Sequence, residues 1–229
     1  MGATALIVSF GSLTAIGVDP ASARAAAVVS TPVSEAAGAL LAVEAQLEVT
    51  PVPLAAASPG AVLVSAATTD PAGVPSPYQQ IVAQFADRRA ELARLVAADA
   101  GVSASDLEAV WAKTDDRRMA AVYSALSQVG TLYKRRGVSP GGFDCSGFTS
   151  WAWAQAGVNI PRSSAGQIRT LGARDTTQLQ PGDIVWRPGH VMMYLGVGDA
   201  VVHSPQSGKR VTVARWGKVK RFGSPLAEA

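Results

Sequence analysis

The order of two hydrophobic patterns most constrains the fold of this 229-residue chain. From Tyr78 onward, apolar residues recur at helical spacing, with Ile81 and Phe85 on the same face as Tyr78, which indicates helices that each bury one side. Later in the chain, short β-like runs at 183–186, 190–195, 200–204 and 210–215 are separated by turns that contain glycine or proline. Helices followed by an antiparallel meander predict an α+β fold.

The residues before Tyr78 follow neither pattern. Residues 25–77 are rich in alanine and contain seven prolines, so we interpret them as a flexible, disordered segment. A shortened chain that starts at Tyr78 is therefore expected to stay folded and active.

The first residues resemble a targeting signal. The apolar run at residues 5–18 is short for a membrane span, and the Ala21-Ser22-Ala23 motif after it is typical of a signal-peptide cleavage site. No Lys or Arg precedes Arg24, so the usual basic start is missing. We expect residues 1–24 to be a signal peptide and the protein to be secreted or associated with the cell wall.

Charge divides the chain at the same place. Residues 1–77 carry one basic and five acidic side chains, whereas residues 78–229 carry 19 basic and 12 acidic ones, a net charge of +7. This charge suggests an anionic partner, and nucleic acid, a membrane surface and an acidic cell-wall polymer all fit it. One cysteine excludes an intramolecular disulfide, and together with two histidines it argues against a structural zinc site.

The single cysteine stands in the stretch GGFDCSGFTSWAW. Cys145 follows a glycine-rich turn and opens a run whose apolar residues share a helical face, so we expect it at a helix N-terminus. Unpaired N–H groups and the helix dipole at that end stabilise a thiolate and can bind the oxyanion of a tetrahedral intermediate. The pKa of Cys145 is accordingly expected to lie below that of a free cysteine. The alternative is an unreactive, buried side chain.

The two histidines supply a candidate base. His190 begins one β-like run and His203 ends the next, so adjacent antiparallel strands can bring the two rings together. One ring could then deprotonate the thiol while the other ring orients it.

Several ordered motifs surround these residues. They are Tyr133, PGGFDCSG at 140–147, GVNIPRSS at 157–164, LQPGDIV at 179–185, His190-Val191 and VHSP at 202–205. Together they resemble the NlpC/P60 family of cell-wall peptidases, over a region from about Met119 to Phe222. The resemblance implies a catalytic domain at residues 115–229. The helical pattern before it defines a helical segment at residues 78–114.

The resemblance implies a papain-like α+β fold in which a nucleophile at a helix N-terminus packs on an antiparallel sheet. It implies Cys145 as the nucleophile, His190 as the base and His203 as the residue that orients the base. It also implies that the Tyr133 hydroxyl stabilises the oxyanion. The residues that it assigns to the substrate groove, beside Tyr133, are Asp144, Ser146, Arg162 and Ser163.

The chain departs from the family pattern at two places. Lys134-Arg135-Arg136-Gly137 follows Tyr133, where family members often have a tryptophan and glycines, so we expect a more basic groove rim. The interval from His190 to His203 is one residue longer than usual. Because a one-residue shift turns strand side chains to the other face, the turn near Gly196 and Gly198 must absorb the extra residue if His203 is to reach His190.

The resemblance implies a peptidoglycan endopeptidase that hydrolyses stem-peptide amide bonds, usually between D-γ-glutamyl and a diamino acid. Free carboxylates on such a substrate suit Arg162 and the basic rim. Thiol, base and oxyanion donors suffice for this chemistry, so no metal or organic cofactor is expected. The expected partners are peptidoglycan stem peptides, with anionic cell-wall polymers as a further candidate, no nucleic acid and no stable membrane span.

Two alternatives stay open. The first is a Cys/His amidase or acyltransferase that acts on another amide or ester. The second is a catalytically silent wall-binding module. Selective alkylation of Cys145 near neutral pH favours either enzyme, whereas an inert thiol favours the binding module.

Overall fold

The structure is a computed structural model that describes residues 29–49, 77–219 and 221–226. The expected signal peptide at residues 1–24 and residues 50–76 of the expected flexible segment lie outside the described residues. The described elements, in chain order, are α1 (Pro32–Val49), α2 (Pro77–Ala100), α3 (Ala104–Trp111), α4 (Asp116–Leu126), β1 (Val138–Ser139), β2 (Gly142–Phe143), α5 (Cys145–Gln155), α6 (Ser164–Thr170), β3 (Gly172–Arg174), β4 (Ile184–Arg187), β5 (His190–Tyr194), β6 (Ala200–His203), β7 (Thr212–Arg215) and β8 (Arg221–Ser224).

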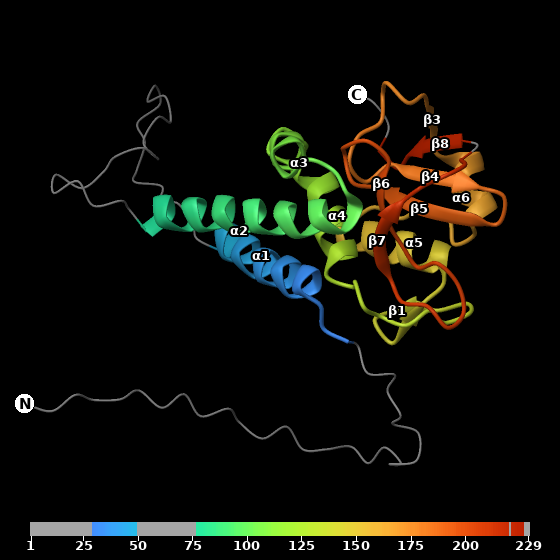
Figure 1. Ribbon diagram of the computed structural model, residues 1–229, viewed down its shortest axis with the longest axis horizontal. Helices are drawn as coiled ribbons and strands as arrows, with labels where there is room; N and C mark the ends of the chain where they lie inside the picture. The colour runs from blue at the N-terminus through green and yellow to red at the C-terminus, as the bar shows by residue number, and fades with distance from the viewer. Residues whose placement is uncertain (1–28, 50–76, 220, 227–229) are drawn as a thin grey trace, which may run out of the picture.

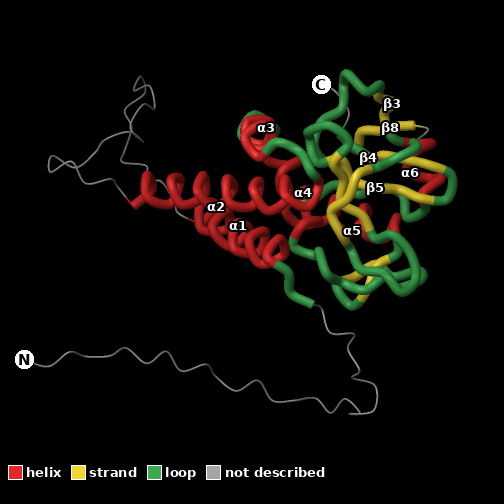
Figure 2. The backbone as a smooth tube through the Cα atoms, viewed as in Figure 1, coloured by secondary structure: helices red, strands yellow, loops and turns green. Residues whose placement is uncertain are grey.

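Helices come first along the chain and strands dominate the second half, which confirms the expected α+β fold (Figure 1). Helices α1 and α2 lie side by side and extend away from the sheet (Figure 1). Helix α4 packs against α1 and α5, α5 packs against β5, and α2 also contacts β7. Colouring by secondary structure shows α1 to α4 on one side of the molecule and the strands, together with α5 and α6, on the other (Figure 2).

Helix α1 corrects the interpretation of residues 25–77 as flexible throughout. Pro32 stands at the first helical position, where its missing N–H costs nothing, and Thr31 Oγ1 accepts a hydrogen bond from the backbone N–H of Ser34 at 3.1 Å. Val33, Ala37 and Leu40 then form a buried face against α2 and α4. The interpretation is wrong for residues 32–49 because this stretch holds no proline after its first position and buries one face by tertiary packing.

The main sheet has six antiparallel strands in the order β3-β8-β4-β5-β6-β7. Strands β4 to β7 form the expected meander, and β8 returns to pair between β3 and β4. Along β5, Val191 and Met193 belong to the main core, whereas Met192 and Tyr194 belong to a smaller cluster of buried residues. This alternation follows from the two-residue period of a strand and was expected from the sequence.

One continuous cluster of buried residues joins the helices to the sheet. It includes Leu40 of α1, Leu92 of α2, Leu126 of α4, Phe148 of α5 and Val191 of β5. The helical segment at residues 78–114 therefore shares its core with the catalytic domain that the sequence placed at residues 115–229.

A buried ion pair fixes α4 against the sheet. Arg118 Nη1 donates to Asp183 Oδ1 at 2.8 Å and to the carbonyl oxygen of Pro181 at 3.1 Å, and Nη2 donates to Ser224 Oγ at 2.7 Å. The side chains of Arg118 and Asp183 are 3% and 0% exposed. Asp183 Oδ2 also accepts the backbone N–H of Gln180, so both ends of the pair keep partners after losing water.

Candidate active site

Cys145 is the first residue of α5, as the sequence predicts. Asp144 is the N-cap: its backbone is extended, and its Oδ1 accepts the backbone N–H of Gly147 at 2.7 Å. An aspartate before the helix satisfies one of the free N–H groups of the first turn, which explains why the helix begins here. The Cys145 side chain thus lies at the positive end of the α5 dipole.

The two histidine rings meet across neighbouring strands. His190 Nε2 and His203 Nδ1 are 2.8 Å apart, and the ring planes lie at 74°. Gly196 and Gly198 in the connecting turn have φ values of 115° and 56°, which favour glycine. This turn absorbs the longer interval, so His203 reaches His190 despite the extra residue.

Cys145 lies beside the backbone on both sides of His190. Its Sγ is 4.0 Å from the carbonyl oxygen of Gly189, and the backbone N–H of Val191 is directed at the sulfur. Within the described part of the chain, Sγ makes no hydrogen bond to a histidine ring. Because Nε2 of His190 is engaged by His203, Nδ1 is the ring nitrogen that remains for the thiol.

Burial raises the pKa of the Cys145 thiol, and the nearby carboxylate of Asp144 raises it further. The backbone N–H groups of Val191 and Ser146 oppose this rise without reversing it. The expectation of a lowered thiol pKa is therefore wrong for this structure, because desolvation of the sulfur outweighs the helix N-terminus.

Burial also lowers the pKa of His190 to about 4, helped by the charges of His203 and Arg187. The pKa of His203 falls to about 4, through burial and then Arg187. At neutral pH the site thus holds a neutral thiol and two neutral imidazoles. Sequence reasoning missed Arg187. This residue comes directly before the Pro-Gly turn that ends at Gly189, and it is therefore the strand partner of His190.

A cavity of about 530 Å³ opens at Cys145. It gathers all five residues expected to shape the substrate groove. Its lining consists of Tyr133, Arg136, Asp144, Cys145, Ser146, Arg162, Ser163, Ser164 and Gly189. Sequence reasoning named Arg136 only as part of the basic rim and gave Ser164 and Gly189 no role in the substrate groove.

Arg162 is held by Asp144 in a bidentate ion pair. Its Nη2 lies 2.6 Å from Asp144 Oδ2 and its Nη1 lies 3.0 Å from Oδ1, while Nη1 also donates to Ser146 Oγ at 3.0 Å. Although burial opposes ionisation of Asp144, the Arg162 guanidinium and the N–H groups of Gly147 and Arg136 lower its pKa. The charge of Arg162 is thus already neutralised, so this arginine fixes the groove wall and is not a free partner for substrate carboxylates.

The hydroxyl of Tyr133 stays protonated beside the thiol. Partial burial raises its pKa, and the neighbouring Cys145 and Asp144 raise it further. A protonated phenol at this place can donate a hydrogen bond to an oxyanion.

Gln167 supports the site from behind, which sequence reasoning missed. It is fully buried, and its Nε2 donates to the carbonyl oxygens of Ser146 at 3.0 Å and Pro161 at 2.8 Å. Its Oε1 accepts the hydroxyl of Thr149 at 2.9 Å. These bonds tie the first turn of α5 to α6.

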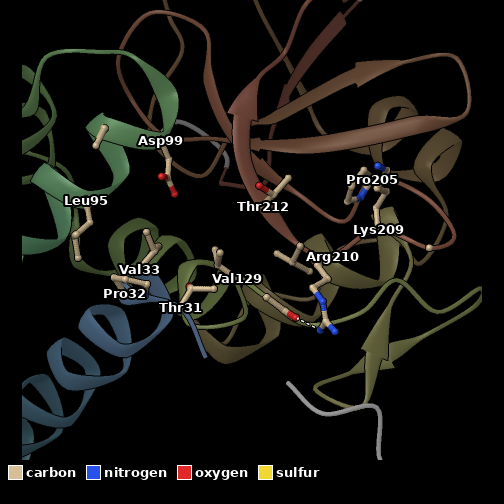
Figure 3. A pocket seen from close by; sticks show the side chains of 14 residues that line it. Thr31, Pro32, Val33, Leu95, Asp99, Val129, Pro205, Lys209, Arg210 and Thr212 are labelled. Carbon is tan, nitrogen blue, oxygen red and sulfur yellow. Dashed lines mark hydrogen bonds between the residues drawn. The ribbon is translucent and has the colours of Figure 1, made fainter. Parts of the chain in front are cut away.

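A second cavity, of about 610 Å³, lies between the N-terminal helices and the connection from β6 to β7 (Figure 3). Asp99 and Leu95 of α2 line one side, and Lys209 and Arg210 line the other, where Arg210 Nη1 donates to the carbonyl oxygen of Gly130 at 2.7 Å. This cavity holds no cysteine or histidine and is separate from the lining at Cys145.

Among the residues that the structure describes, no helix is both long and apolar enough to cross a membrane. No three side chains of the His, Cys, Asp or Glu type come together there as a metal site.

A thiol at a helix N-terminus beside a histidine pair defines a Cys/His site on an α+β fold. Residues 130–219 match the NlpC/P60 family. The chain therefore contains a domain of the NlpC/P60 family, with the family's α+β fold.

Part of the chain is similar to named relatives. The chain is 41% identical over 99 residues to a probable endopeptidase of Mycobacterium tuberculosis, a match that covers 42% of this chain and 26% of that protein. It is 38% identical over 93 residues to a γ-D-glutamyl-L-lysine dipeptidyl-peptidase of Bacillus cereus, covering 37% and 28%. A probable endopeptidase of Corynebacterium glutamicum is 38% identical over 109 residues, covering 46% and 51%. The chain thus spans about a quarter of the length of its mycobacterial relative and half of the corynebacterial one.

Among solved structures, an NlpC/P60 family protein from Bacillus cereus is 29% identical, with a TM-score of 0.45 and coverage of 48% of this chain and 40% of that one. The NlpC/P60 domain of the peptidoglycan hydrolase SagA is 33% identical, with a TM-score of 0.43 and coverage of 47% and 97%.

Proposed function

We propose that this protein is a cysteine peptidase that hydrolyses amide bonds in the stem peptides of peptidoglycan. The observation that carries the proposal is the placement of Cys145, at the N-terminus of α5, beside the His190–His203 pair and at the edge of a cavity. The relatives named endopeptidase support the reaction class.

In this proposal the neutral His190 acts as a general base. Its Nδ1 takes the thiol proton as Sγ attacks the scissile carbonyl carbon, while His203 accepts the proton on Nε2 of His190 and keeps Nδ1 free. The tautomers are assigned from this hydrogen bond. This mechanism starts from a neutral thiol and a neutral imidazole, which agrees with the raised pKa of Cys145 and the lowered pKa of His190. The proton moves from sulfur to His190 only as the bond between sulfur and carbon forms.

The tetrahedral oxyanion then needs donors. Backbone N–H groups at the start of α5 are directed at the sulfur, and Tyr133 lines the same cavity, so both can supply them. The C–N bond breaks as His190 returns the proton to the leaving amine. Water, deprotonated by the same imidazole, hydrolyses the thioester to a carboxylic acid and regenerates the thiol.

We place the scissile bond between D-γ-glutamyl and a diamino acid. The support is the relative whose name specifies a γ-D-glutamyl-L-lysine substrate. The cavity at Cys145 is lined by side chains that can donate hydrogen bonds, namely Tyr133, Ser163 and Ser164, which suits a polar peptide.

Export follows from such a substrate, because peptidoglycan lies outside the cytoplasmic membrane. The apolar run and the Ala21-Ser22-Ala23 motif support a cleaved signal peptide. N-terminal sequencing of protein recovered from the culture medium or wall tests this, and an intact N-terminus on exported protein would contradict it. We further propose that the basic residues 78–229 bind anionic wall polymers, with salt-sensitive co-sedimentation as the test.

The function itself is tested with purified peptidoglycan and mass spectrometry of the released fragments. We expect fragments that end at γ-D-glutamate from the unmodified protein and none from Cys145→Ala, which keeps helix α5. Equal release by the two proteins would refute the proposal.

A further inference from the structure

Arg136 stands out at the cavity beside Cys145. Among the described non-glycine residues it alone has a left-handed backbone, with a φ of 61°. This conformation is strained for arginine but not for glycine, and strained residues of this kind are concentrated at functional sites. The backbone N–H of Arg136 is directed at the carboxylate of Asp144, which helps to fix the conformation.

The guanidinium of Arg136 is also the free charge of this cavity. Among the described residues that line it, Asp144 and Arg162 neutralise each other, and Arg136 makes no ion pair and no side-chain hydrogen bond. Arg136 is exposed, so its side chain is accessible to a substrate. One uncompensated cation thus remains among the residues that line the cavity.

We infer that Arg136 is a specificity-determining residue that binds a free carboxylate on the substrate next to the scissile bond. The inference rests on the proposed function. A γ-linked glutamyl residue carries a free α-carboxylate, because its side-chain carboxyl forms the peptide bond. Arginine matches a carboxylate with two parallel hydrogen bonds, whereas the amidated form of the same residue offers no charge and a single acceptor oxygen.

The inference predicts discrimination between carboxylate and carboxamide stem peptides. A hydrogen bond between charged groups typically contributes about ten- to hundredfold in affinity. The probes are alanyl-γ-D-glutamyl-L-lysine amide and the same peptide with the glutamyl α-carboxylate converted to a carboxamide. Each is used for kcat/KM with the active protein and for calorimetric binding to the uncleaving Cys145→Ala variant.

We expect the unmodified protein to prefer the carboxylate peptide by about tenfold or more, and Arg136→Gly to abolish the preference by weakening only that peptide. Arg136→Gly should keep or raise the melting temperature, since glycine accepts the left-handed backbone. Arg136→Lys should keep part of the preference through its point charge. The matched control is Arg135→Gly, which removes the same charge from an exposed neighbour that does not line the cavity.

Two results would overturn the inference. One is an unmodified protein that treats both peptides alike in cleavage or, where cleavage fails, in binding to Cys145→Ala. The other is an Arg135→Gly variant that loses the preference as completely as Arg136→Gly. That result would show that the preference for the carboxylate peptide comes from the overall positive charge of this region and not from Arg136. Absence of cleavage of peptidoglycan and both peptides contradicts the proposed function instead, while the binding measurement still decides the role of Arg136.

Discussion

Replacement of Leu40 by alanine tests whether α1 is part of the folded domain. Leu40 is completely buried on the face of α1 that packs against α2 and α4. The change removes three carbon atoms, and at about 0.8 kcal/mol for each buried methylene the lost transfer free energy is about 2.4 kcal/mol. A partly collapsed cavity adds roughly 1 kcal/mol, which gives about 3 kcal/mol in total.

This loss is large beside the ~5–15 kcal/mol stability of a typical protein. For a chain of this size it corresponds to a fall in melting temperature of roughly 6–12 °C. Urea titration, followed by circular dichroism and by tryptophan fluorescence, measures it. The matched control is Leu41→Ala in the next position, where the side chain is only partly buried and the loss should be less than half as large.

A Leu40→Ala protein that unfolds within about 0.5 kcal/mol of the unmodified one would show that α1 is not docked in solution, since that is the scatter of surface substitutions. The active-site cavity includes no residue of α1, so cleavage by the folded variant should stay unchanged. A chain that starts at Tyr78 loses Val33 and Ala37 as well. It should therefore be less stable than Leu40→Ala, contrary to the expectation from sequence.

Four further outcomes test the site and its support. His203→Gln should retain measurable cleavage and His203→Ala less, because glutamine can still accept the His190 proton; unchanged cleavage by His203→Ala would remove its orienting role. Iodoacetamide labelling of Cys145 should rise with pH through an inflection above the ordinary cysteine value, and an inflection below neutrality would contradict a buried neutral thiol. Because the pKa values of His190 and His203 each fall from 6.5 unfolded to about 4 folded, stability should be complete above pH 6.5 and decline by about 3 kcal/mol for each histidine toward pH 4, a decline that is smaller in His190→Gln. Arg118→Ala leaves the Asp183 carboxylate buried without its main partner and should cost about 3–5 kcal/mol in urea titration, whereas a loss under about 1 kcal/mol would show that the pair is dispensable.

Local rules explain what the sequence could predict. An aspartate before Cys145 and a two-residue period through His190 are short-range signals, and the structure follows them in the start of α5 and in the alternation along β5. The meeting of the two histidines needed one further condition, a turn able to absorb an extra residue. Gly196 and Gly198 meet it, because glycine accepts a positive φ.

Packing decides what the sequence left hidden. Helix α1 depends on burial against α2 and α4, which residue composition does not reveal, so its alanines and prolines suggested a flexible segment. The pairing of Arg162 with Asp144 joins residues that are 18 positions apart. The direction of the pKa shifts at Cys145 and His190 depends on how completely the fold excludes water from each group.

The carboxylate of Asp144 has a consequence for how substitutions combine. It caps α5 through Gly147, binds Arg162 in two places and faces the backbone of Arg136. Groups that share one partner are energetically coupled, so a double-mutant cycle between Asp144 and Arg162 should show a large departure from additivity. Loss of Asp144 would release the arginine, the helix cap and the strained residue together. The effect of a substitution at Arg162 or Arg136 should therefore depend on whether Asp144 is present. This carboxylate thus couples the evolution of neighbouring positions at the entrance to the active site.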